Sequence, residues 1–404
     1  MRYVIVGGGV AGVTAAREIR KLDPAGKVYI YSAEPYPYYY RPKLWEFIAG
    51  RISAEETYFR QEVWYTQEGI QLHLSTTVNA LDLQNRQLVM ADGLRVDYDR
   101  LLLASGGRSF IPPVDGADLP GVFALRTLDD AKAIAAFSDQ AGSATLIGGG
   151  LLGLETAKAL LDRGLKVRVV EIMERLLPRQ LDEPGAAVLQ AYLEQLGLEV
   201  HLATKVEKIT SSETGLLLHL ENGRQLNSGL AIFSAGIRSN IEMWKSAGLS
   251  SGRGLLVDPY LVTSEADVYG AGDVAEFEGV VYGIIPAASE QGRIAAINMV
   301  KPGSEVYRGT LPSNRLKIVG MEFISYGEAT AEGDEISILR RVSPEGGRYE
   351  RLALRDGKIV GAIILGDSKR AMEIKHLMES EIEVGAYQDG LLNDDFDLRS
   401  IFPD

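Results

Sequence analysis

The sequence predicts an α/β protein in which one unit of strand, glycine-rich turn, helix and strand occurs twice, before a C-terminal α+β region. Two observations support this fold class. The turns at 7–12 and 148–153 each follow a short apolar run and precede a helical pattern. From about residue 307 the pattern changes to strand-like runs broken by turns. The chain has 404 residues, which is the length of two to three domains.

The first unit begins at the N-terminus. Arg2–Val6 is a β-branched apolar run that predicts a strand, and the turn at 7–12 leads into a helix that ends near Leu22. Lys27–Tyr31 predicts the second strand. Residues 101–103 form an apolar run that ends in small residues, and we expect this run to return to the same sheet.

The second unit repeats this order. Residues 145–147 predict a strand, and 154–162 predict a helix after the turn at 148–153. Lys166–Val170 predicts the next strand. Residues 231–233 resemble 101–103, and we expect them to close the second half in the same way.

The last part of the chain lacks a glycine-rich phosphate turn. A helical pattern at 371–378 follows several strand-like runs that are separated by turns. The runs lie at 316–319, 335–340, 349–354 and 359–365. This order predicts a separate α+β region.

Composition excludes several classes of function. Lys and Arg number 42 against 55 Asp and Glu, and the formal net charge of −13 argues against general binding to nucleic acid. The chain has no cysteine, which excludes a redox-active dithiol, a thiolate nucleophile, and metal or iron–sulfur sites held by cysteine. The four histidines are scattered, so we expect no metal site. We expect a cytoplasmic protein, since neither a signal peptide nor a transmembrane stretch is recognisable.

The spacing Gly-x-Gly-x-x-Gly after a strand has a definite chemical use. The first glycine permits the tight turn, the second lets the backbone approach a pyrophosphate, and the third lets helix and strand pack closely. The following helix presents free N–H groups and the positive end of its dipole. One such motif can serve packing alone, but two in the same context predict two bound dinucleotides. The glycines are Gly7, Gly9 and Gly12 in the first turn and Gly148, Gly150 and Gly153 in the second.

A carboxylate near the end of the second strand is expected to bind the adenosine ribose. In the second unit this residue is Glu171, which would accept from a ribose 2′-OH and repel a 2′-phosphate, so NADH is favoured over NADPH. A solvent-facing glutamate is the alternative interpretation. In the first unit the strand end is Ser32, and we assign the ribose role to Glu34, two residues later.

Five segments in this order resemble the FAD-dependent pyridine nucleotide–disulfide oxidoreductase superfamily. They are GGGVAG at 7–12, LLLASGG at 101–107, GGGLLGLE at 148–155, SAGIRSN at 234–240 and YGAGDV at 269–274. Three more are similar to the branch of NADH:rubredoxin reductases, nitrite reductase flavin modules and oxygenase-coupled ferredoxin reductases: YYRPKL at 39–44, LRTLDD at 125–130 and LGD at 365–367. The resemblance covers nearly the whole chain. It implies two Rossmann-like domains, for FAD and NAD, and a C-terminal α+β domain.

The resemblance also implies which residues surround FAD. Arg41 and Pro42 would lie beside the flavin, and Asp273, after Gly272, would bond to the ribityl–phosphate region. The helix entered at Pro286 would point its N–H groups at the flavin and stabilise negative charge there, with simple helix packing as the alternative. Further residues near FAD would be Ala104, Ser105 and Gly106.

On the nicotinamide side, the resemblance implies that Gly236 lines the NADH pocket. Arg126 would contact FAD, with a surface arginine as the alternative. Glu155 would reach toward the nicotinamide and flavin, and a cation would offset the burial of its carboxylate. Lys43 is our candidate for that cation, although some relatives carry their lysine where this chain has Glu46.

The resemblance implies an FAD domain at 1–112 and 246–306, an NAD(P)H domain at 113–245 and a C-terminal domain at 307–404. We expect hydride to pass from NADH to FAD, and electrons to pass on to a small iron redox carrier of rubredoxin or ferredoxin type. The alternatives are direct reduction of oxygen, quinone or another small molecule, and a redox-sensing or flavin subunit of a larger complex. A homodimer or membership of a larger complex is the expected assembly. An acidic chain would repel an acidic carrier, so docking requires a local basic patch. Its candidates are Arg41, Lys43, Arg51, Arg60, Arg293, Arg315 and Lys317.

Overall fold

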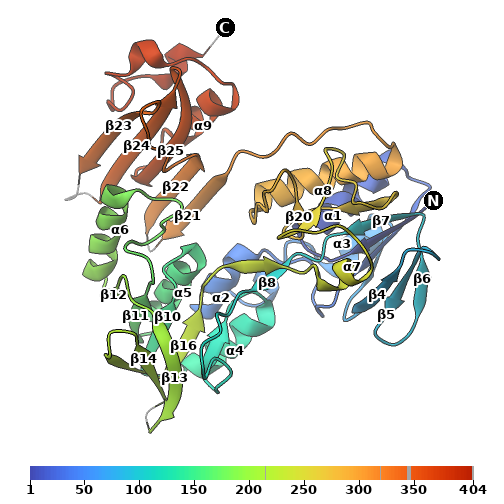
Figure 1. Cartoon of the computed structure of the whole chain (residues 1–404), viewed down its shortest axis with the longest axis horizontal. Helices are drawn as coiled ribbons and strands as arrows, with labels where there is room; N and C mark the ends of the chain where they lie inside the picture. Colours follow the sequence, from blue (N-terminus) through green and yellow to red (C-terminus); the bar gives the residue numbers. More distant parts are fainter. Residues whose placement is uncertain (214, 319, 344–346, 403–404) are drawn as a thin grey trace. The chain divides into compact units, whose positions relative to one another are not determined.

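The computed structural model describes residues 1–213, 215–318, 320–343 and 347–402, without the side chains of 316–318 (Figure 1). The chain divides into two compact units. The first comprises Met1–Lys43, Ser53–Arg108 and Ile237–Thr310, and the second comprises Leu44–Ile52, Ser109–Gly236 and Leu311–Asp404. The chain passes between the units near the predicted domain boundaries, but the C-terminal region and the short segment Leu44–Ile52 both group with the second unit.

The first unit is built on a parallel sheet of five strands in the order β19-β7-β1-β2-β3. These strands are β1 (Arg2–Val6), β2 (Lys27–Tyr31), β3 (Ile70–His73), β7 (Arg100–Leu103) and β19 (Val268–Gly270). The predicted return of 101–103 is confirmed, because β7 pairs in parallel with β1. This order places the carboxyl ends of β1, β7 and β19 side by side, which is where open α/β sheets bind ligands.

Two helices of the first unit pack tightly together beside this sheet. They are α1 (Val10–Leu22) and α8 (Ile285–Val300), and Figure 1 shows them lying along each other. A Cβ added at Gly292 would lie 2.4 Å from the carbonyl oxygen of Ala11, so only glycine permits this approach.

Smaller elements complete the first unit. The short helices are η1 (Arg41–Lys43), η2 (Glu55–Thr57), α3 (Glu62–Gln67) and α7 (Glu242–Ser246). The remaining strands are β4 (Val78–Asp82), β5 (Gln87–Met90), β6 (Arg95–Asp97), β8 (Gly107–Ser109), β17 (Ile237–Ser239), β18 (Leu255–Leu256) and β20 (Ala275–Glu276). The chain leaves the first unit at the end of β8 and returns to it at β17, and these two strands pair with each other.

The second unit repeats the parallel architecture, with strand order β12-β11-β10-β16-β9. Its strands are β9 (Val122–Ala124), β10 (Ser143–Ile147), β11 (Lys166–Val170), β12 (Glu199–His201) and β16 (Leu230–Phe233). Its helices are α2 (Leu44–Ile48), α4 (Leu128–Ser138), α5 (Leu151–Asp162) and α6 (Glu183–Gln195). A separate antiparallel sheet contains β13 (Val206–Ser212), β14 (Gly215–Leu220) and β15 (Gln225–Ser228). The predicted closure by 231–233 is confirmed, because β16 pairs in parallel with β10.

The C-terminal region is an antiparallel sheet in the order β21-β22-β25-β24-β23, covered by α9 (Ala371–Glu379). Its strands are β21 (Ser313–Ile318), β22 (Met321–Gly327), β23 (Ser337–Ser343), β24 (Arg348–Arg355) and β25 (Lys358–Gly366). Two single turns of helix follow, η4 (Gly385–Tyr387) and η5 (Leu398–Ile401). The prediction found four of these strands and missed β22, and Val319 of the first predicted run lies outside the described residues.

A buried carboxylate connects this region to α6. Asp182 is the N-cap of α6, where it accepts from the Gly185 N–H at 3.2 Å. Its other oxygen accepts from the Tyr349 hydroxyl at 2.5 Å and from Arg340 at 3.0 Å, and the Arg351 Nε lies 3.3 Å away. Burial raises the pKa of Tyr349, and its bond to Asp182 raises it further. These contacts explain why the C-terminal sheet groups with the second unit.

No helix in the described part of the chain combines the length and the apolar character that crossing a membrane requires.

Candidate nucleotide-binding sites

The first glycine-rich turn is shaped by the protein at two of its three motif glycines. Gly7 has φ +114°, and a Cβ there would lie 2.1 Å from the carbonyl oxygen of Ala104. A Cβ at Gly12 would lie 2.0 Å from the carbonyl oxygen of Gly7. At Gly9, by contrast, a Cβ would meet nothing within 4 Å. Nothing in the protein requires the middle glycine, so its position is open for a ligand to approach the backbone.

The second turn has the same geometry. Gly148 has φ +118°, and its Cβ would lie 2.3 Å from the carbonyl oxygen of Ser234. A Cβ at Gly153 would lie 2.5 Å from the carbonyl oxygen of Gly148. At Gly150 the nearest atom is 4.0 Å away. Both turns therefore fit a pyrophosphate that lies against the middle glycine.

Three long helices begin without a side-chain cap. In α1, α5 and α8, no side chain accepts a hydrogen bond from the first-turn N–H groups, whereas Thr127 caps α4 and Asp182 caps α6. Uncapped N–H groups at a helix N-terminus form a site for an anion. Sequence analysis assigned these three helices to the cofactors, and Pro286 stands in the first turn of α8. The C-terminal helix α9 also begins without a side-chain cap.

The carboxyl edge of the first sheet brings several predicted residues together. Ala104, Ser105 and Gly106 follow β7, while Gly272 and Asp273 follow β19, and these strands are neighbours. All five residues are predicted to contact FAD, and nothing in the structure tests these contacts.

Three residues that the sequence analysis did not assign, Asn240, Trp244 and Gln291, hold this edge. Trp244 Nε1 donates to the Ser105 hydroxyl at 3.0 Å, and that hydroxyl donates to the Asn240 carbonyl at 3.3 Å. Gln291, buried in α8, accepts from the Gly272 N–H at 2.8 Å. Both the Ser105 hydroxyl and its carbonyl, which accepts from the Asn240 amide at 2.9 Å, are therefore used inside the protein. Asn240 is the last residue of the SAGIRSN segment, so this motif could have identified Asn240 as a site residue.

Glu34 lies in a network with the loop that carries Arg41. Arg41 donates to one Glu34 oxygen at 2.6 Å and to the Tyr39 hydroxyl at 2.7 Å, and Tyr39 donates to the other Glu34 oxygen. Burial alone would lower the pKa of Arg41, but Tyr39 and Glu34 outweigh it, so the pKa of Arg41 is raised. Pro42 follows in η1. Both Glu34 oxygens are thus engaged within the protein, and its ribose role stays a prediction.

Glu171 is buried at the carboxyl end of β11, so the alternative of a solvent-facing glutamate is wrong. One oxygen accepts from the Gly149 N–H at 2.6 Å, and the other accepts from the Met173 N–H at 2.8 Å. A carboxylate oxygen has two acceptor positions, so each oxygen can still accept from a ribose hydroxyl. Gly236, with φ +96°, follows β16 at the same sheet edge.

Arg126 follows β9 in the second unit, and its backbone N–H donates to the Asp130 carboxylate at 2.9 Å. The predicted contact of Arg126 with FAD stays a prediction. Lys43 belongs to the first unit, where its ammonium group donates to the Glu56 carbonyl at 3.2 Å. Glu155 belongs to the second unit, and the proposed pairing of Lys43 with Glu155 also stays a prediction.

Glu155 is only 7% exposed in the first half of α5. Burial, together with the nearby charge of Glu46, raises the pKa of Glu155 to about 8. Neither carboxyl has an ion-pair partner among the residues that the structure describes.

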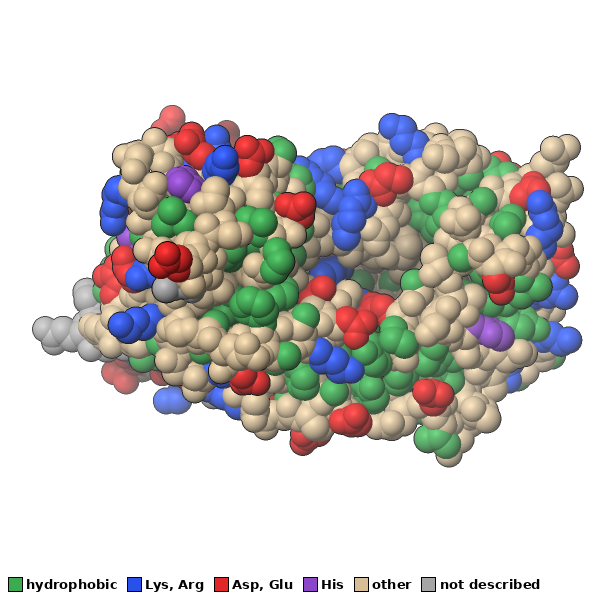
Figure 2. All heavy atoms as spheres, turned by 90° about the horizontal axis from the view of Figure 1, so that it is seen from below, with side chains coloured by type: hydrophobic (Ala, Val, Ile, Leu, Met, Phe, Trp, Pro, Cys, Tyr) green, Lys and Arg blue, Asp and Glu red, His purple; other side chains and the backbone are tan. Residues whose placement is uncertain are grey.

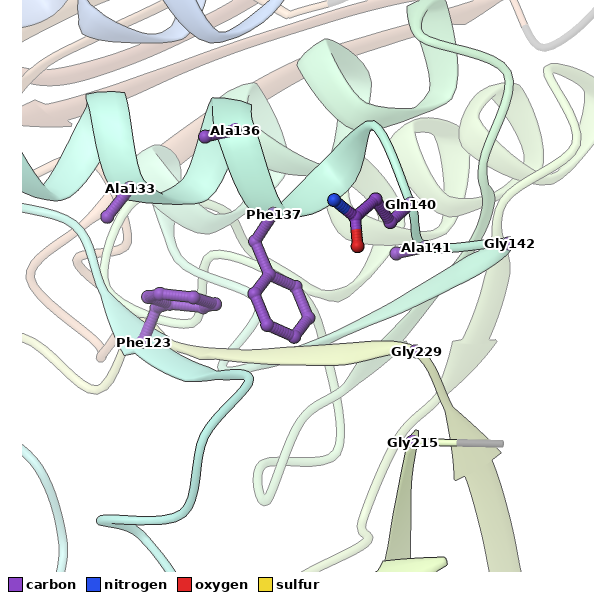
Figure 3. Close-up of a pocket in the computed structure, with 9 residues that line it drawn as sticks. All are labelled: Phe123, Ala133, Ala136, Phe137, Gln140, Ala141, Gly142, Gly215 and Gly229. Atoms are coloured by element: carbon purple, nitrogen blue, oxygen red, sulfur yellow. The ribbon is translucent and has the colours of Figure 1, made fainter. Parts of the chain in front are cut away.

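An open cavity of about 520 Å³ lies elsewhere on the second unit (Figure 3). The rings of Phe123 and Phe137 pack edge to face there with centroids 5.3 Å apart, and Gly142 and Gly229 also line the cavity. Gly142 and Gly229 directly precede β10 and β16, so the cavity lies at the amino edge of the sheet. The turn at 148–153 lies at the opposite edge, and the cavity is not part of the predicted nucleotide site.

Four of the predicted docking cations are paired within their own unit. The pairs are Arg41–Glu34, Arg51–Asp162, Arg293–Glu305 and Arg315–Glu322. Arg60 instead lies over the rings of Phe59 and Trp64, at 4.5 and 5.2 Å from their centroids. The side chain of Lys317 lies outside the described residues. On the face drawn in Figure 2, basic and acidic side chains are interspersed.

Comparisons with known proteins agree with this geometry. The profile of the pyridine nucleotide-disulphide oxidoreductase family matches residues 1–292, and that of the rubredoxin NAD+ reductase C-terminal domain matches residues 312–382. The chain is 32% identical over 369 residues to the assimilatory nitrate reductase electron transfer subunit of Bacillus subtilis, covering 91% of this chain and 48% of that protein. It is 31% identical to the NADH-rubredoxin oxidoreductase of Clostridium acetobutylicum, covering 94% of both chains.

Among solved structures, the complex of putidaredoxin reductase with putidaredoxin is similar, with 25% identity and a TM-score of 0.87 over 99% of this chain and 97% of that one. The chain spans about half the length of several curated relatives, from 41% to 48%. The expected fold class, two Rossmann-like domains and a C-terminal α+β domain, is confirmed. This chain belongs to the pyridine nucleotide-disulphide oxidoreductase family.

Proposed function

We propose that this chain is an FAD-dependent NADH oxidoreductase that passes electrons to a small iron redox carrier without a redox-active cysteine. One observation carries the proposal. Two turns each leave their middle glycine, Gly9 and Gly150, open in front of an uncapped helix. In this proposal the first unit holds FAD, and residues 113–236 of the second unit hold NADH.

Each group of residues has a role in this reaction. Bound FAD supplies an acceptor for hydride and a donor of single electrons. Gly7, Gly9 and Gly12 bind its pyrophosphate, and Arg41 lies beside the flavin. Glu171 binds the NADH ribose and disfavours a 2′-phosphate. Hydride transfer needs no protein acid or base, so the chain contributes positioning and the exclusion of water. Replacing Lys43 by Met is expected to slow flavin reduction.

The names of similar proteins support a small iron redox carrier as the electron acceptor. The relative from Clostridium acetobutylicum, which matches this chain along 94% of both lengths, is named for rubredoxin, and a similar structure holds a reductase with its putidaredoxin. Since the chain has no cysteine, electrons must leave the flavin directly. A flavin subunit of a larger complex is the second candidate, because a relative named as an electron transfer subunit is about twice as long. A cytoplasmic location and a homodimer stay predictions.

The test is anaerobic mixing of the FAD-loaded chain with NADH and, separately, with NADPH, followed through the visible flavin band. Rubredoxin or ferredoxin is then added, and its own absorbance reports its reduction. Gly150→Ala is the matched control, since it should keep the fold and lose the nucleotide.

We expect rapid bleaching by NADH, weak bleaching by NADPH, and rapid reduction of a carrier. Oxygen consumption faster than the reduction of any carrier would favour direct reduction of a small molecule. If NADH bleaches the flavin but neither a carrier nor a small molecule accepts its electrons, the result would favour a flavin subunit of a larger complex. Absence of bleaching by either nucleotide would overturn the proposed function.

A further inference from the structure

The second unit holds two carboxyl groups together beside its nucleotide turn. Glu155 is buried on α5, and Glu46 is half-buried on α2, which packs against α5. Within the described residues, the Glu155 carboxyl makes no hydrogen bond and neither carboxyl makes an ion pair. Two acidic side chains thus lie on neighbouring helices, close enough for the charge of Glu46 to act on Glu155.

The basic side chains near this pair bind other groups. Lys158 and Arg51 both pair with Asp162, and Arg163 donates to the Ile48 carbonyl at 2.8 Å and to Asp139. Among the side chains that the structure describes, the other charged groups on elements packed against α2 and α5 are Asp129, Asp130 and Lys132 on α4, Lys166 and Arg168 on β11, and Arg315 on β21. The charge that acts on Glu155 is that of Glu46.

These surroundings favour a proton on the pair. The charge of Glu46 makes a further charge on the buried Glu155 carboxyl unfavourable, so Glu155 tends to keep its proton. Burial raises the pKa of Glu155 to about 8, and Glu46 contributes to the shift. At neutral pH Glu155 is therefore mostly the neutral acid.

The pair lies close to the anion-binding end of α5. Glu155 follows the N-cap Gly150 by five residues, which is a rise of about 7.5 Å along the helix. Side chains on a helix lean toward its N-terminus, so the carboxyl leans toward the turn. A charged carboxylate at this distance would repel a pyrophosphate at the turn, whereas a neutral acid would not.

We propose that the Glu155–Glu46 pair couples nucleotide binding to a proton, so that the chain binds NADH in the protonated state of the pair and releases nucleotide when the pair ionises. This inference rests on the proposed function, in that it requires NADH at the 148–153 turn. NADH carries one more net negative charge than NAD⁺, because the oxidised nicotinamide ring is a cation. Ionisation of the pair therefore weakens NADH binding more than NAD⁺ binding, and pH sets the preference between reduced and oxidised nucleotide.

The test measures the dissociation constants of NADH and NAD⁺ by calorimetry between about pH 6 and 9.5, in buffers of different ionisation enthalpy. NADH has no group that titrates near neutral pH, so a change reports on the protein. We expect NADH affinity to fall about ten- to hundredfold through the titration of the pair, with net proton uptake on binding where the pair is ionised. The fall for NAD⁺ should be smaller.

Variants separate the two members of the pair. Glu155→Gln should abolish the pH dependence and keep tight binding at high pH. Glu46→Gln should move the midpoint to lower pH, and Glu46→Lys should move it further, because the new cation stabilises the Glu155 carboxylate. Glu207→Gln, an exposed acid on β13, is the matched control and should behave like the wild-type chain.

A second readout needs no nucleotide. The infrared carbonyl band of a protonated carboxyl should be present at neutral pH, should disappear at high pH, and should be absent in Glu155→Gln. If NADH binds with an affinity that does not depend on pH, or if the band is absent in the wild-type chain, this inference is overturned while the proposed function stands. If NADH does not bind at any pH, the proposed function itself fails.

Discussion

The two glycine-rich turns share their backbone geometry and differ in their acidic neighbours. In each turn the first and third glycines prevent collisions with backbone carbonyls, and the second faces open space. In the first unit, however, Glu34 is bound by Arg41 and Tyr39, whereas in the second unit Glu171 is bound by two backbone N–H groups.

A second difference lies on the helix after each turn. Two residues beyond the third glycine, the first unit has Thr14 and the second has the buried Glu155. The glycines therefore decide that each unit can accept a dinucleotide. In the proposed function, the carboxylates set how much negative charge each nucleotide meets, and in the second unit burial raises the pKa of one of them, Glu155.

The largest effect is expected from the glycines that the fold itself requires. Gly7→Ala and Gly148→Ala should each lower the free energy of unfolding by about 3 kcal/mol or more, because each combines a positive φ with a collision below 2.5 Å. Denaturant unfolding of the cofactor-free chain measures this loss.

The middle glycines are the matched comparison for this prediction. Gly9→Ala and Gly150→Ala should change the free energy of unfolding by less than about 1 kcal/mol, since an added Cβ meets no protein atom closely. Gly9→Ala should weaken FAD binding, and Gly150→Ala should weaken NADH binding. Wild-type affinity in both variants would show that the open space does not receive a ligand.

The next effect concerns the pH dependence of stability. Burial raises the pKa of Glu155 to about 8 from its ordinary value of 4.5, so the folded chain holds a proton that the unfolded chain releases. Stability from this group is fully present below pH 4.5 and is lost as pH rises through 8. Relative to Glu155→Gln, the wild-type chain should lose up to about 5 kcal/mol across this window. If the free energies of unfolding of the two proteins change with pH in the same way, Glu155 is not a buried, protonated acid.

A smaller effect is expected for nucleotide preference. Glu171→Gln should reduce the preference for NADH over NADPH about tenfold or more, because the amide does not repel a 2′-phosphate and bonds less strongly to a ribose hydroxyl. The ratio of the two bleaching rates measures the preference. An unchanged ratio would show that Glu171 does not bind the ribose.

The smallest effect is expected in the first unit. Glu34→Gln breaks a partly exposed ion pair with Arg41, so the free energy of unfolding should fall by about 1 kcal/mol or less. FAD affinity should fall a few fold, while the NADH preference should not change. A loss of NADH preference in this variant would mean that the two units do not divide the nucleotides as proposed.

Local sequence signals were sufficient for the elements around both turns. The strands Lys27–Tyr31 and Lys166–Val170 have the predicted bounds, because a β-branched run beside a glycine-rich turn is a short-range pattern. The C-terminal strand β22 was missed, since Glu322 and Ser325 interrupt its apolar run. The bond from Gly272 to Gln291 was missed for another reason, because no local pattern connects residues in separate elements.

By itself, the sequence determined the number of dinucleotide units, the absence of cysteine chemistry and the strands that flank each turn, because all of these depend on residues that are neighbours in the chain. Only the tertiary structure decided which acids are buried and what binds them. It bound both Glu34 oxygens through Tyr39 and Arg41, buried Glu171 against backbone N–H groups, and brought Glu46 on α2 to Glu155 on α5. Burial and charge depend on which elements meet in space, and segments far apart in the sequence meet only when the chain folds.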